Sequence, residues 1–410
     1  MAGDSPSSPP ARRGWSYLYA ILATLLVVSV ILYPAVAFQS ATAGLRIWWD
    51  VVFPALLPFF IGSEILVGLG VVHFLGVLME PLMRPLFNVP GTGSFVMAMG
   101  LASGYPIGTV LTSRLTREGL CNSVEGERLM SFTNTADPLF MSGAVATGMF
   151  GLPAAGGAIM FGHYLGALGV GILLRFHDPG APVTAPPEGT GERSRTLLRR
   201  AADALYAARS RDGRAFGQLL GDAVKNSVNT LLMIGGFIIL FSVVIQVLRA
   251  VGLVDLVASG VRYVTVLAGL DPALTPGLIA GFFEISIGNQ VVSQAAAPLV
   301  DRVVAASAIT AWSGISVVGQ VAAIVQGTRI RLYPYVLSRV VHAVLAGWLT
   351  WIYLTHIHLP AAAVVSMPGV TWTGRLWDST RMFGLASAGL LIAAVAGGLF
   401  RGVRWTEWKA

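Results

Sequence analysis

The chain has little charge and almost no cysteine. Only 11% of its 410 residues are charged, and Cys121 is the single cysteine. A water-soluble domain carries about 25% charged residues, so this composition argues against a soluble enzyme. A lone cysteine also excludes an internal disulfide bond and a metal site built from several cysteines.

Motifs for enzymatic chemistry are missing from the sequence as well. It contains no nucleophile with a partnered base, no phosphate-binding loop and no pair of catalytic carboxylates. The histidines follow no ligand spacing with carboxylates or cysteines. We therefore expect no enzyme, no metal and no cofactor. The formal net charge of +7 comes from arginines at the ends of apolar segments, so nucleic acid is not an expected partner.

Apolar residues, glycine and proline are abundant. The chain is 55% hydrophobic and contains 48 glycines and 22 prolines, and its mean hydropathy is +0.71. This composition is typical of membrane helices that are interrupted and closely packed. Because a helix needs about 20 mostly apolar residues to cross a bilayer, we searched for such runs. The ten candidates lie near residues 16–38, 52–79, 94–113, 131–150, 155–175, 225–248, 275–298, 304–326, 334–354 and 382–400.

The charged segments predict the orientation of these helices. The first apolar run follows Arg12 and Arg13 and is interpreted as a retained anchor with a cytoplasmic N-terminus. Residues 177–216 carry five acids and seven arginines, which predicts a cytoplasmic linker that is partly helical after Ser194. The basic tail is also expected in the cytoplasm. Five full crossings would place the two ends of each half on opposite sides of the membrane, although both ends are predicted in the cytoplasm. Each half therefore needs one re-entrant segment. We expect an all-α polytopic protein with about eight transmembrane helices and two re-entrant segments.

The two halves also resemble each other in sequence. The run MAMGLASGYPIG from Met97 parallels LIAGFFEISIG from Leu278, and SFTNTADPLFMSG from Ser131 parallels AWSGISVVGQ from Ala311. Under the predicted topology the first repeat begins outside and the second begins inside. This predicts an inverted repeat, as in many secondary transporters.

Four segments within these repeats have an irregular composition for a membrane helix. They are residues 102–108, 134–138, 284–290 and 313–316, which combine Gly or Pro with polar side chains. Non-helical backbone survives in a membrane only where it is buried or lines a water-filled cavity. Broken helices expose N–H groups that attract anions. We therefore expect a solute site built from Ser103, Gly104, Tyr105, Asn134, Thr135, Asp137, Glu284, Ser286, Asn289, Gln290, Ser313 and Ser316.

Less specific interpretations of the same residues stay open. The small residues also suit helix packing, and Asn134, Asn289 and Gln290 also suit hydrogen bonds between helices. Asp137 and Glu284 could bind a coupling cation, exchange a proton or cap free N–H groups.

Several runs together resemble one family. They are PALLPFFIGSEILVGLGVV, PLMRPLFNVPG, GLASGYPIG, EGERLMSFTNTADPLFMSGAV, HYLG and FFEISIGNQ, in this order along the chain. They resemble the sporulation integral membrane protein YlbJ family, also called SpoVV, of the nucleoside-recognition or Gate superfamily. The resemblance implies a fold related to concentrative nucleoside transporters and passage of dipicolinate from the mother cell across the outer forespore membrane.

The resemblance and the residue patterns together define the expected organisation. We expect a cytoplasmic N-terminus and anchor at 1–44, a first Gate-type repeat with its following span at 45–176, the linker at 177–216, a second Gate-type repeat at 217–330, and two spans with a cytoplasmic tail at 331–410.

The expected function is alternating-access transport of a small planar anionic solute, with dipicolinate first. A nucleoside transporter of the same fold and a non-transporting scaffold for spore cortex assembly are the alternatives. The expected partners are the solute and the lipid bilayer, while H⁺ or Na⁺ coupling and a homo-oligomer stay open.

Overall fold

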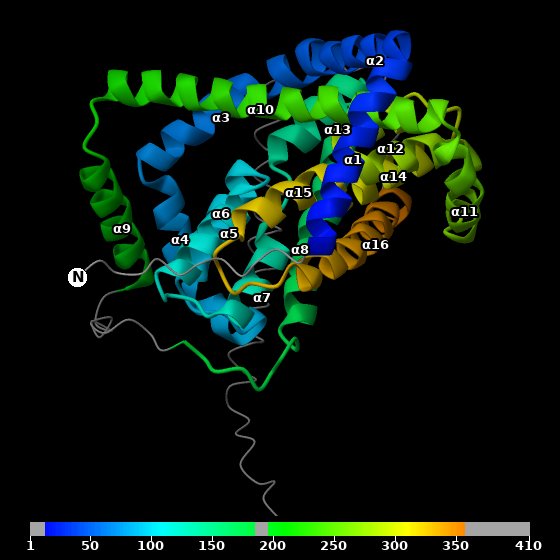
Figure 1. Cartoon of the computed structure of the whole chain (residues 1–410). Helices are drawn as coiled ribbons and strands as arrows, with labels where there is room; N and C mark the ends of the chain where they lie inside the picture. The colour runs from blue at the N-terminus through cyan, green and yellow to red at the C-terminus, as the bar shows by residue number, and fades with distance from the viewer. Residues whose placement is uncertain (1–12, 185–195, 357–410) are drawn as a thin grey trace, which may run out of the picture.

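The computed structural model describes residues 13–184 and 196–356 (Figure 1). Within these ranges the chain is helical and forms no strand, which confirms the all-α prediction. The elements of the first half are α1 (Arg13–Leu32), α2 (Pro34–Arg46), η1 (Ile47–Val52), α3 (Phe53–Gly68), α4 (Val71–Leu82), η2 (Met83–Phe87), α5 (Gly93–Ser103), α6 (Ile107–Arg117), α7 (Ser123–Thr133), η3 (Phe140–Met149) and α8 (Ala155–Leu174). Those that follow are α9 (Leu197–Asp212), α10 (Phe216–Ala250), α11 (Leu253–Leu267), η4 (Pro272–Leu274), α12 (Thr275–Phe283), α13 (Ile285–Ser293), α14 (Leu299–Trp312), α15 (Gly314–Ile324) and α16 (Leu332–His356).

Fewer helices can cross a membrane than the sequence predicted. The described residues contain four sufficiently long and apolar segments, namely α8, α10, Leu299–Ile324 and α16. A fifth is possible in length if Ala23–Leu32 and Pro34–Val52 count as one span, although these two helices are bent by 104°. About eight crossings are therefore not confirmed. Glycine and proline divide the other predicted runs into helices that are too short to cross a membrane individually. The predicted run at 382–400 lies outside the described residues.

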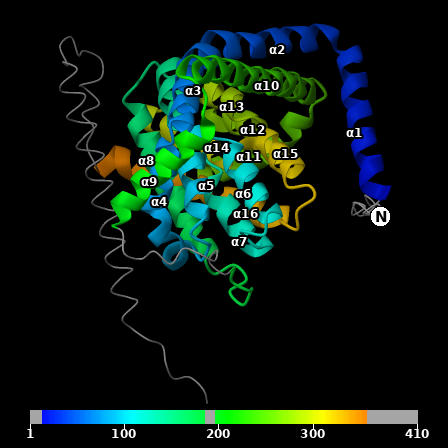
Figure 2. The same ribbon diagram turned by 90° about the vertical axis from the view of Figure 1, so that its left-hand side faces the viewer.

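The predicted anchor is not one straight helix. It ends at Leu32, and α2 begins with Pro34 at its first helical position. Proline disfavours helical backbone at the residue before it, and Tyr33 has a non-helical ψ of 55°. Figures 1 and 2 both show α2 running beside α10. The chain entering the body of the protein is tied to α10 by Trp48, whose Nε1 donates to the Leu231 carbonyl at 2.8 Å.

Part of the segment predicted as a linker forms a helix. Helix α9 lies within residues 177–216 and packs against α4, where Gly70 approaches the Leu205 carbonyl. An ion pair of 2.6 Å joins Arg200 on α9 to Glu80 on α4. The linker helix is therefore held against the first half of the chain.

Helices α8, α14 and α16 form the tightest packing. Gly162 on α8 lies against the Ala346 carbonyl and Thr350 of α16, where a larger side chain would not fit. The Thr350 hydroxyl is 2.7 Å from the Ser307 hydroxyl of α14. Small residues and interhelical hydrogen bonds of this kind are typical of helices in lipid, where apolar burial adds little.

All four predicted interruptions are confirmed as helix breaks. Helix α5 ends at Ser103 and α6 begins at Ile107, while α7 ends at Thr133 and η3 begins at Phe140. In the second half, α12 and α13 meet at Glu284, and α14 and α15 meet at Ser313. The breaks thus divide the segments at the places where the sequence combines Gly or Pro with polar residues.

The breaks of each half lie against one another. A Cβ atom on Gly104, whose φ is +74°, would lie 3.1 Å from the Asp137 nitrogen. A Cβ atom on Gly314, whose φ is +79°, would lie 2.9 Å from the Phe283 carbonyl oxygen. Glycine supplies both the positive φ and the close approach at these two positions. Each half therefore brings two interrupted segments to one place.

We expect Gly288→Ala to destabilise the protein, because its Cβ would collide with the Gly281 backbone on α12. Overpacking typically costs about 1–3 kcal/mol. The check is the unfolding temperature of the purified protein in detergent. Gly319→Ala on α15 is the control, since a Cβ there meets no atom within 4 Å. Equal unfolding temperatures for both variants would contradict this packing.

Candidate functional site

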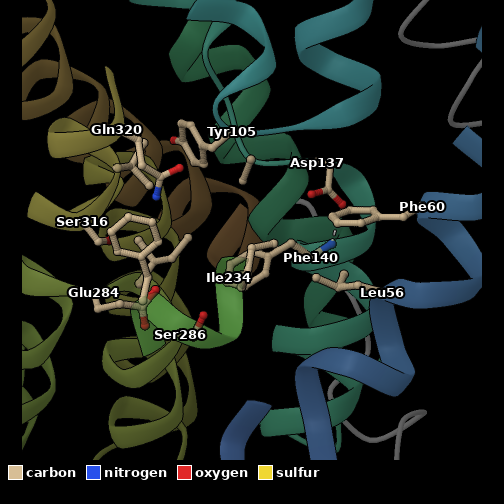
Figure 3. A pocket seen from close by; sticks show the side chains of 14 residues that line it. Leu56, Phe60, Tyr105, Asp137, Phe140, Ile234, Glu284, Ser286, Ser316 and Gln320 are labelled. Atoms are coloured by element: carbon tan, nitrogen blue, oxygen red, sulfur yellow. Dashed lines mark hydrogen bonds between the residues drawn. The ribbon is translucent and has the colours of Figure 1, made fainter. Parts of the chain in front are cut away.

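A cavity lies where the helix breaks of the two halves meet. About 580 Å³ of space unfilled by protein atoms lies within its bounds, and this volume includes space open to solvent. Figure 3 shows side chains from both halves pointing into it. Five of the predicted residues line it, namely Tyr105, Asp137, Glu284, Ser286 and Ser316.

The apolar wall of the cavity was not predicted from the sequence. Leu56 and Phe60 on α3, Phe140 on η3, and Ile234 and Phe237 on α10 contribute most of it. Their helices are apolar overall, and nothing in the sequence distinguishes these side chains from ordinary packing residues. Gln320 on α15 adds a polar side chain on the same side as Tyr105 (Figure 3).

Two carboxyl groups face the cavity, one from each half. Asp137 is 6% exposed and Glu284 is 4% exposed. Figure 3 shows them on opposite sides of the cavity. A buried carboxylate in a membrane is costly and marks a functional position by default.

Both acids also cap a helix end. One Asp137 oxygen accepts hydrogen bonds from the backbone N–H groups of Leu139 at 3.0 Å and Phe140 at 2.8 Å. One Glu284 oxygen accepts from Ile287 N–H at 2.9 Å. Capping, one of the three roles left open by the sequence, is therefore present at both acids. The N–H groups that would attract an anion are in part already occupied by the protein's own carboxylates.

The remaining predicted residues lie outside the cavity lining. Asn134 donates to the Tyr335 hydroxyl at 2.8 Å, and Thr135 donates to the Gly100 carbonyl at 3.3 Å. Asn289 donates to the Ile285 carbonyl at 2.8 Å and to the Thr310 hydroxyl at 3.1 Å. These bonds support the alternative interpretation that the amides tie helices together. The other residues outside the lining are Ser103, Gly104, Gln290 and Ser313.

A buried arginine near the cavity was not predicted from the sequence. Arg339 on α16 is fully buried and donates to the Asn134 carbonyl at 3.0 Å and to the Ser131 carbonyl. His163 accepts the Ala136 N–H at 3.0 Å, and His342 lies with its ring centroid 4.6 Å from that of His163. The signal available in the sequence was an arginine in the first third of the apolar run 334–354.

A second cluster of charges holds the beginning of α7. Glu127 is 1% exposed and binds the Arg331 guanidinium at 2.7 and 2.8 Å, and it lies 2.8 Å from His177. Burial alone would raise the pKa of Glu127, but the hydrogen bonds from Arg331 and His177 outweigh it, so the net pKa is lowered from 4.5. Glu125, also buried, pairs with Arg84 at 2.6 Å. This cluster fixes α7 to the loop that leads into α16.

We expect Glu127→Gln to lower the unfolding temperature at neutral pH, because it removes the buried carboxylate that binds Arg331 and His177 and leaves Arg331 only the longer pair with Asp178, at 3.9 Å. A lowered carboxyl pKa stabilises the fold above pH 4.5, and this contribution disappears as pH falls through the pKa of the folded protein. Thermal unfolding from pH 7 down to pH 3 should therefore bring wild type and variant together. Glu118→Gln, which breaks an exposed pair with Arg114, is the control and should change little. A constant difference between wild type and Glu127→Gln at every pH would contradict the assignment.

Comparison with known proteins relates the chain to a sporulation protein. Residues 49–171 match the Gate family, described as nucleoside recognition. The chain is 44% identical over 334 residues to the sporulation integral membrane protein YlbJ of Bacillus subtilis (strain 168), and the match covers 80% of each protein. A solved structure of CNTnw in an inward-facing substrate-bound state aligns over 83% of this chain and 87% of that chain, with a TM-score of 0.43 and 14% identity. On the identity and coverage of the Bacillus relative, the chain belongs to the YlbJ family of sporulation integral membrane proteins.

Proposed function

We propose that this integral membrane protein transports a small planar anionic solute, dipicolinate, from the mother cell towards the forespore. The observation that carries the proposal is the cavity to which helix breaks of both halves contribute. Interrupted helices around a central site are typical of secondary transporters. The sporulation relative supports a role in sporulation. We place the protein in the outer forespore membrane, with both termini in the cytoplasm.

The cavity has groups suited to an aromatic dicarboxylate. Tyr105, Phe60 and Phe140 offer ring surfaces for a planar ring. Ser286, Ser316 and Gln320 offer hydrogen-bond donors for carboxylate oxygens. Small molecules are usually bound in this way, by an apolar wall and a few placed polar groups.

The two acids favour coupled transport. An ionised Asp137 or Glu284 would repel an anionic solute unless a proton or a cation neutralised it. Binding of H⁺ or Na⁺ at either carboxyl would therefore raise the affinity for the solute. We propose that the two halves form an inverted repeat and rock around the cavity, so that it opens to one side at a time.

A nucleoside transporter is the second candidate. The match of residues 49–171 to the family described as nucleoside recognition favours it. Amide and hydroxyl groups beside an aromatic ring would suit a nucleoside as well. If proteoliposomes take up uridine but not dipicolinate, this candidate is favoured. If they take up neither solute, a non-transporting membrane scaffold is favoured.

Filling the cavity should stop transport. Ser316→Leu places a larger apolar side chain in the lining, so we expect uptake of labelled dipicolinate into proteoliposomes to fall at least about tenfold. Ser259→Leu on the exposed face of α11 is the matched control and should transport like wild type. Equal uptake by Ser316→Leu and wild type would exclude this cavity as the route.

Removing one carboxyl charge should uncouple transport. Glu284→Gln keeps an oxygen that can accept from Ile287 N–H, so the helix cap survives, but the group no longer binds a proton or cation. We expect the stimulation of dipicolinate uptake by an imposed proton or sodium gradient to be lost. Uptake without a gradient should persist. A gradient effect as large as in wild type would remove Glu284 from the coupling mechanism.

A further inference from the structure

One basic side chain is completely buried within a membrane-spanning helix. Arg339 on α16 is 0% exposed and is among the largest side chains buried to this extent. In the described part of the chain, Arg128 on α7 is the other buried arginine, at 2% exposed, and it donates to the backbone carbonyls of Asn88, His177 and Asp178. None of the ion pairs among described residues includes Arg339. Its charge is thus held in the protein interior without an ion-pair partner among the residues that the structure describes.

The guanidinium is fixed by the helix break at the end of α7. It donates to the carbonyl groups of Ser131 and Asn134, which lie at the negative end of that helix dipole. It also lies 5.0 Å from the centre of the Tyr335 ring. Its Nε atom is buried and has no hydrogen-bond partner among the described residues. Neutral donors could satisfy two carbonyl groups, so the backbone bonds alone do not require a charge here.

This charge lies directly behind the cavity wall. Tyr105 lines the cavity and packs in one cluster with Tyr335, and the Arg339 guanidinium lies over the Tyr335 ring. Asn134, which Arg339 holds through its carbonyl group, precedes Asp137 of the lining by three residues. The two acids would by themselves make the cavity repel anions. A positive charge behind Tyr105 counteracts that field, and its effect is strong because little water screens it.

We propose that Arg339 determines the charge specificity of the cavity, favouring an anionic solute through its electrostatic field and by positioning the end of α7 at residues 131–134. The proposal rests on the proposed function, in that it concerns the solute of that same cavity. Arg339 itself does not line the cavity, so it acts as a positioning and specificity-determining residue. Its removal should therefore change which solutes bind, and not only how well the protein folds.

Binding to the full-length purified protein tests this directly. Two ligands of the same shape are compared by calorimetry, the dianion pyridine-2,6-dicarboxylate and the neutral pyridine-2,6-dicarboxamide. Wild type should prefer the dianion, and Arg339→Gln should reduce the ratio of the two affinities at least about tenfold. Arg339→Lys keeps the charge but loses the fork of donors, so it should keep most of the preference while unfolding at a lower temperature. Arg302→Gln is the matched control, because Arg302 also donates to a backbone carbonyl, that of Ser293, away from the cavity.

The outcomes separate this inference from the proposed function. If Arg339→Gln lowers the affinities for both ligands equally, so that their ratio is unchanged, the specificity role is overturned. If Arg339→Gln does not fold, a folded Arg339→Lys protein without preference for the dianion overturns it as well. A wild-type protein that does not prefer the dianion in binding also overturns it. Flux is measured separately in proteoliposomes, where binding of the dianion without its transport would refute the transport function but not the role of Arg339.

Discussion

The structure depends on how the protein satisfies the backbone at its helix breaks. Each interruption leaves N–H groups at one helix end and carbonyl groups at the other, and lipid offers no hydrogen bonds to either. The protein meets these groups with its own charged side chains. Asp137 and Glu284 accept from N–H groups, and Arg339 donates to carbonyl groups at the end of α7. At the α7–η3 and α12–α13 breaks these side chains supply hydrogen bonds that lipid cannot.

One carboxyl group can both cap a helix and take part in solute binding. A carboxyl group that caps a helix beside a cavity is held in place by that bond, while its other oxygen is available to a proton, cation or solute. Asp137 and Glu284 both have this geometry. The same holds for Arg339, which stabilises the break and contributes a charge to the space in front of it. Interactions that stabilise the break therefore also determine the electrostatics of the cavity.

The charged cluster around α7 adds a second constraint. Glu127 binds Arg331 and His177, and Arg339 binds the other end of the same helix. Helix α7 is thus linked at both ends to α16 or to the loop before it. Under the proposed rocking of the two halves, α7 would therefore move together with α16 unless these bonds break.

Composition and local pattern determined the membrane character, the all-helical structure and the position of all four breaks, because glycine, proline and polar residues act on the backbone locally. The lining by Tyr105, Asp137, Glu284, Ser286 and Ser316 followed from those breaks. Only the tertiary structure decided that Asn134 and Asn289 are bonded to other helices, that α3 and α10 supply the apolar wall, and that Arg339 lies behind Tyr105. These facts depend on which faces of distant helices meet, and periodicity in a nearly uniformly apolar chain does not distinguish one face from another. The number of crossings is not fixed by composition for the same reason, since an apolar run has the same composition whether it spans the bilayer or folds back within it.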